Sequence, residues 1–207
     1  MQILKHIKKA LESTGLKLTA NEDGDVFTGF PCAPPCPSTE RLFVHIFACR
    51  ETVLLTATVF EDEGDPDAYK ELTNDQKDKI SALLGRLSGK VTEGALELHP
   101  LGPVVTASWP QSLVSGASPG DLAASLKSLA LFGGIFLPTL KDIIALLLQN
   151  PEMTLDEAEE AFEGAFKTAI DEVMKAALQG AGIDGTTVSS SNGTYTYPPT
   201  EENNNSN

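Results

Sequence analysis

The order of sequence patterns along the first 148 residues predicts an α+β fold, in which helices pack an antiparallel sheet of about five strands in the order α-β-β-β-α-β-β-α. Two observations predict the sheet: two hairpin-like pairs of strands follow an opening helical pattern, and a second helical pattern precedes two further strands. A third observation, an amphipathic pattern after residue 150, adds a C-terminal helix.

The chain opens with a helical pattern. Apolar residues recur at helical spacing over residues 3–11, with lysines on the opposite side, and Gly15 supplies the stop. Residues 16–20 and 25–30 flank residues 21–24, whose asparagine, aspartate and glycine tolerate the positive φ angles of tight turns. A short helix followed by a hairpin is therefore expected.

The strongest strand pattern lies in residues 42–49 and 52–60. Both segments are rich in β-branched and aromatic residues, and they meet across Arg50 and Glu51. The first of them is apolar on both faces except at His45, which predicts a central position in the sheet.

A second helix and two short strands complete the predicted sheet. Thr73 and Gln76 fit a capping box, and apolar residues at helical spacing follow until Gly89. Strands are expected near residues 95–99 and 104–109, because a proline- and glycine-rich turn separates two short apolar runs.

Residues 121–149 form the most apolar stretch of the chain. Gly133, Gly134 and Pro138 lie within it, and we expect them to kink or split a helix there. The charge-free run over residues 128–140 is shorter than the roughly 20 residues that span a bilayer. The stretch therefore predicts a buried core helix rather than membrane insertion.

A long amphipathic helix is predicted over residues 154–179. Thr154 and Glu157 form a second capping box, and a continuous apolar stripe lies opposite a row of acidic residues. The polar segment that follows cannot bury enough apolar surface to order itself. The predicted organisation is a domain over residues 1–149, an amphipathic helix over residues 150–180 packed on the domain or on a partner, and a disordered polar tail over residues 181–207.

Composition limits the partners and the compartment. The net charge is −14, and an acidic body repels nucleic acid and anionic lipid while it favours solubility or basic partners. We therefore expect no nucleic-acid binding. Three cysteines are an odd number in a chain without a secretory signal, which indicates a reducing, cytoplasmic compartment.

The cysteines are the most conspicuous candidates for chemistry. Cys32 and Cys36 lie in a proline-rich, irregular segment, and their spacing differs from the C-x-x-C of thioredoxin-like redox sites. Cys49 and His45 share one side of their strand and could join them in a zinc or redox site, although loop cysteines without a metal are the favoured interpretation. Nucleophile elbows and glycine-rich phosphate loops are missing from the sequence, so we expect neither an enzyme nor a cofactor.

The order of elements resembles the YbjN-like domains and the class I type III secretion chaperones. The resemblance is carried by the opening helix at residues 3–14, the turn at residues 21–25, the strand pair at residues 41–60, the helix at residues 73–87 and the late strands at residues 95–109. It implies a non-catalytic surface that binds a client peptide in extended form. The proline-rich loop, the apolar stretch and the added helix and tail depart from the family pattern.

The first functional hypothesis is a non-catalytic module that binds a protein or peptide client and has a chaperone- or regulator-like role. Its candidate contact residues are Phe43, Phe47, Leu54, Phe60 and Trp109 of the strands and Phe162, Phe166 and Ile170 of the last helix. Burial of the strand residues in the core is the alternative interpretation. A second hypothesis is a structural or accessory subunit of a larger assembly that docks through residues 154–179; a homodimer is a further possibility.

Overall fold

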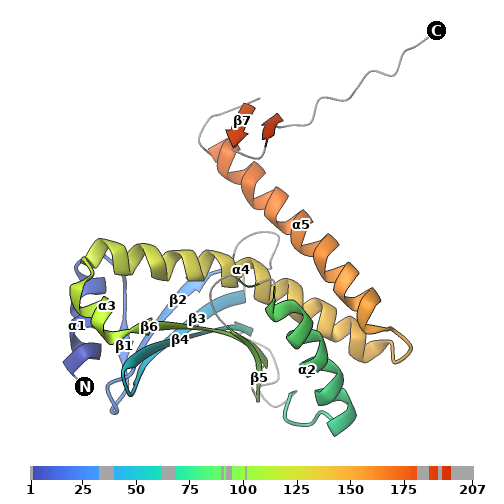
Figure 1. The fold of residues 1–207 in the computed structure, drawn as a ribbon, viewed down its shortest axis with the longest axis horizontal. Coiled ribbons are helices and arrows are strands. Elements are labelled where there is room, and N and C mark those ends of the chain that lie inside the picture. The colour runs from blue at the N-terminus through green and yellow to red at the C-terminus, as the bar shows by residue number, and fades with distance from the viewer. Residues whose placement is uncertain are drawn as a thin grey trace.

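The computed structural model describes residues 2–32, 40–61, 69–89, 91, 95–100, 102–180, 187–190 and 193–196 (Figure 1). The elements, in chain order, are α1 (Gln2–Glu12), β1 (Thr19–Ala20), β2 (Val26–Pro31), β3 (Glu40–Cys49), β4 (Thr52–Glu61), α2 (Asn74–Ser88), β5 (Ala95–His99), β6 (Gly102–Pro110), α3 (Gln111–Gly116), α4 (Pro119–Gln149), α5 (Leu155–Gly180), β7 (Thr187–Ser190) and β8 (Gly193–Thr196).

The predicted α+β fold with an antiparallel sheet and a C-terminal helix is confirmed. The main sheet has six strands in the order β1-β2-β3-β4-β6-β5, and every neighbouring pair is antiparallel. The predicted number of about five strands is one short of this, although both predicted hairpins and the two later strands are present, as β1–β2, β3–β4 and β5–β6. The long strands β3 and β4 occupy the centre, as the apolar character of β3 predicts.

One face of the sheet carries the hydrophobic core. Along β3 the buried residues Leu42, Val44 and Ile46 alternate with residues of the other face, and β4 shows the same period of two. Helix α4 crosses this face, with α1 beside it (Figure 1). At Gly133 a β-carbon would lie 3.4 Å from the side chain of Leu42, so a glycine there lets the helix backbone approach the sheet closely.

Helix α4 is a single helix of 31 residues, so the expected split at Gly133, Gly134 and Pro138 is wrong, while the alternative of a kink at these residues stays a prediction. All residues from 133 to 140 are buried, and this packing outweighs the low helix propensity of glycine and proline. The helix begins after a capping box formed by Ser118 and Asp121, two residues before the predicted start.

Helix α4 is also long and apolar enough to cross a membrane by length and composition. Of its most apolar 18-residue window, 61% is buried inside the fold. The mostly buried core helix of a soluble protein passes the same test.

Two short strands lie within residues 181–207, the predicted polar tail. Within residues 181–207, the segments β7 and β8 pair as a two-stranded antiparallel sheet in the described backbone. Threonine, valine and tyrosine recur in them, and these residues favour strands.

Candidate protein-binding surfaces

The second face of the main sheet carries a row of aromatic side chains. Register pairs Phe27 of β2 with His45 of β3, and Gly29 with Phe43, so these side chains share the face opposite Leu42 and Val44. The helices α1, α3 and α4 lie on the other side of the sheet, while α2 packs beside β5 (Figure 1). No described helix covers the row, which we call the aromatic row and define as Phe27, Phe43, His45 and Phe47.

The aromatic row is held together by ring contacts. The ring of His45 stacks on Phe27 with a centroid distance of 4.5 Å and an interplanar angle of 6°, and it meets Phe47 at 4.7 Å. Phe43 lies across Gly29, since a β-carbon at that glycine would be 3.8 Å from its ring. Phe43 is 39% exposed and therefore presents an apolar surface to solvent.

A tight turn fixes one end of the aromatic row. The backbone N–H of Asp25 donates to the side-chain oxygen of Asn21 at 2.8 Å, which positions the carboxylate after the turn. Oδ2 of Asp25 lies 3.2 Å from Nε2 of His45. The imidazole is thus oriented by a carboxylate on one edge and by two phenyl rings on its faces.

The strands next to the aromatic row give the same face a polar border. Phe47 pairs with Leu54, and His45 pairs with Thr56 of β4. Thr56 in turn pairs with Thr106 of β6. The face therefore combines exposed aromatic surface with hydroxyl groups that can donate and accept hydrogen bonds.

The structure divides the predicted strand candidates between the two faces. Phe43, Phe47 and Leu54 lie together on the face of the aromatic row, where all three are at least partly exposed. Trp109 pairs with the buried Val53 and lies on the core-facing side. There it lines a cleft of about 530 Å³ between β6 and α4. The side chain of Phe60 is outside the described residues.

The candidates on α5 belong to a phenylalanine cluster between α4 and α5. Phe162 is almost fully buried and lies 4.8 Å from Phe136 between ring centroids. Phe166 is half-buried and stacks on Phe162 at 5.5 Å. Ile170, one turn further along the helix, is 38% exposed. Along this side of α5 the side chains therefore become more exposed from Phe162 to Ile170.

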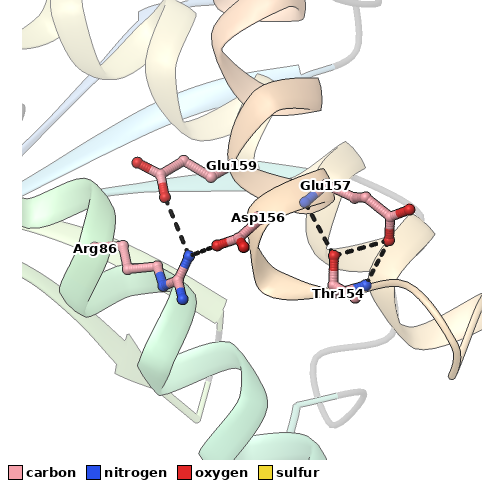
Figure 2. Close-up of polar contacts among 5 residues, drawn as sticks. All are labelled: Arg86, Thr154, Asp156, Glu157 and Glu159. Atoms are coloured by element: carbon pink, nitrogen blue, oxygen red, sulfur yellow. Dashed lines mark hydrogen bonds and ion pairs between the residues drawn. The ribbon is translucent and has the colours of Figure 1, made fainter.

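Polar contacts fix the start of α5 (Figure 2). Arg86 of α2 forms ion pairs with Asp156 and with Glu159, the latter at 3.4 Å. The hydrogen bond with Asp156 is the main cause that raises the pKa of Arg86. Thr154 closes the predicted capping box, because its N–H and hydroxyl both donate to Glu157. These bonds lower the pKa of Glu157.

The described residues contain no group of three or more histidine, cysteine, aspartate or glutamate side chains that could hold a metal ion. Cys32 is half-buried and Cys49 is exposed, while Cys36 lies outside the described residues. The zinc or redox site that these cysteines could form with His45 therefore stays a prediction.

Phe27 is the member of the aromatic row that the sequence did not single out. It lies in a short strand between a buried valine and a buried threonine, and alternation alone does not say which side of that strand faces the core. The partner strand supplies that information, because Phe27 pairs with His45.

Comparison of the chain with models of protein families, with characterised proteins and with solved structures finds no significant match.

Proposed function

We propose that this protein is a non-catalytic protein- or peptide-binding module that holds an extended client segment against the aromatic row. The single observation that carries the proposal is the sheet face that no described helix covers, on which Phe27, Phe43 and Phe47 gather beside His45. Aromatic side chains on otherwise polar surfaces are enriched at protein interfaces and contribute most of the binding energy.

The chemistry of the face supports a peptide as the occupant. Apolar client side chains would contact Phe43 and Phe47, and client backbone or polar groups would bond to hydroxyls such as those of Thr56 and Thr106. The net charge of −14 favours a neutral or basic client over an acidic one. This role matches the chaperone-like behaviour that the resemblance to type III secretion chaperones implies.

The proposal can be tested by site-specific photocrosslinking in the protein's own cells. A benzophenone amino acid in place of Phe43 should capture client polypeptides. The same residue in place of Leu113 of α3, which is 61% exposed but lies away from the aromatic row, is the matched control. Equal capture at the two positions, or capture at neither, would contradict a client site on this face.

A further inference from the structure

Helix α5 carries an apolar ridge that starts at the half-buried Phe166 and is exposed further along the helix. Phe166, Ile170 and Met174 follow one another at four-residue spacing, so they form a row along the helix. Ile170 is 38% and Met174 is 49% exposed. In Figure 1 the C-terminal half of α5 extends away from the sheet and from α2.

A row of charged side chains runs beside the ridge with the same spacing. Glu163, Lys167, Asp171 and Lys175 are all exposed, and their signs alternate along the helix. From Glu163 to Lys175 the charges are negative, positive, negative, positive, and from Lys175 back to Glu163 they have the opposite sign at each position. Two such rows that lie antiparallel therefore match each other at all four positions.

We propose that α5 pairs with α5 of a second copy of this chain, in an antiparallel homodimer centred near Ala169. In this alignment Lys167 lies opposite Asp171 of the second copy, and Glu163 lies opposite Lys175 of the second copy. Because the dimer is two-fold symmetric, each contact occurs twice. An unrelated acidic or basic helix would leave half of the alternating row against like charges.

Packing geometry agrees with the same alignment. Ridges of residues four apart pack into the grooves between such ridges in the commonest class of helix pairs. The charge alignment places Met174 opposite Gly164 of the second copy, and space is open around Gly164 in the structure. Glycine lets another chain approach the helix backbone closely at that point.

The expected association is weak. Exposed ion pairs contribute little individually, and the apolar ridge is only a few side chains wide, which places the interface at the small end of specific contacts. Each copy also carries a net charge of −14, but at physiological salt this repulsion is screened beyond about 8 Å. The alternating row is local and acts within that distance.

Sedimentation equilibrium of the full chain tests the proposal. Between about 1 µM and about 500 µM, the mass should rise from 22.0 kDa towards twice that value. Lys167→Glu alone, or Asp171→Lys alone, replaces two attractive contacts with two repulsive ones and should weaken dimerisation about tenfold. Glu172→Lys makes the same charge change as Asp171→Lys on the opposite side of the helix and is the matched control.

A mixture of the two weakened variants gives the sharpest result. In the mixed dimer the glutamate introduced at position 167 of one chain would meet the lysine introduced at position 171 of the other, and the native Asp171 would meet the native Lys167. Affinity should therefore recover in the mixture and in the double variant Lys167→Glu/Asp171→Lys. Circular dichroism verifies that each variant is folded. A monomer at all concentrations, a dimer insensitive to the single changes, or a mixture without recovery would overturn the antiparallel α5 dimer.

Discussion

Two aromatic clusters of similar composition lie in different surroundings. Between α4 and α5, Phe136 and Phe162 are almost fully buried and make ring contacts with Phe166. On the second sheet face, Phe43 and Phe47 lie in an aromatic row that no described helix covers. The first cluster joins two helices, whereas the second presents apolar surface to solvent.

The difference shows what burial contributes to the role of a phenylalanine. A buried ring stabilises the fold by the apolar area it removes from water and by the contacts it makes with its neighbours. A ring on an open face contributes little to folding and remains available for a partner. Substitutions in the two clusters should therefore separate stability from binding.

The largest effect is expected when α5 is removed. A chain that ends at Leu148 loses Ala158, Phe162 and Ala169 from the interior and uncovers Phe136. Each lost large core side chain costs about 2–5 kcal/mol, and a domain has only about 5–15 kcal/mol in total. Thermal unfolding followed by circular dichroism should show no cooperative transition, and gel filtration should show aggregates.

A chain that ends at Gly180 keeps α5 and is the control for that truncation. It should unfold with the midpoint of the full chain. If the chain ending at Leu148 had the same midpoint, α5 would be an appendage rather than part of the core.

The second effect compares one ring from each cluster. Phe162→Ala should lower the free energy of unfolding by about 3–5 kcal/mol, because it leaves a cavity beside Phe136. Phe43→Ala should lower it by less than about 1 kcal/mol, because Phe43 is 39% exposed. Urea unfolding measures both changes in the free energy of unfolding. Similar losses for the two variants would contradict the distinction between a buried and an exposed cluster.

The third effect concerns binding. With a client identified by crosslinking, Phe43→Ala or Phe47→Ala should weaken the affinity about tenfold or more, since aromatic side chains at the centre of an interface dominate its energy. Isothermal titration calorimetry would measure the affinity of each variant for the client. Leu113→Ala, at an exposed position outside the aromatic row, should leave the affinity unchanged. A loss of affinity for Leu113→Ala alone would indicate that the client binds at α3.

The smallest effect concerns the start of α5 and depends on pH. Thr154→Ala should lower the free energy of unfolding by about 1 kcal/mol near neutral pH, because it removes a helix cap. The pKa of Glu157 is lowered by its bonds with Thr154, so this carboxylate stabilises the fold above its ordinary pKa, and the contribution is lost as the pH falls through the lowered value. The difference between wild type and Thr154→Ala should shrink in acid. A pH-independent difference would show that the ionised Glu157 takes no part.

Local patterns were sufficient for much of the fold. The capping boxes at Thr73 and Thr154 are present as predicted, because each needs only residues three apart in sequence. The hairpin between β3 and β4 turns at Arg50, which has a positive φ of 53°. Helix α3 was not predicted, since its six residues are too few for a periodic pattern.

The candidate surfaces could be predicted only in part. Phe43, Phe47 and Leu54 share a face because side chains alternate along a strand and its partner, and this follows from sequence once the register is known. The assignment of Trp109 to the other face required the pairing of β6 with β4, across an intervening helix and strand. Which segments pair across a long stretch of sequence cannot be inferred from the periodicity of either segment.

The sequence by itself determined the type and the approximate position of most helices and strands, because capping, turn chemistry and periodicity act over a few neighbouring residues. Only the tertiary structure decided that α4 runs unbroken through Gly133 and Pro138, that helices cover one sheet face while no described helix covers the aromatic row on the other, and that Ile170 and Met174 of α5 are exposed. The physical reason is that burial is a property of surfaces brought together from distant parts of the chain, and it can outweigh any local preference along it.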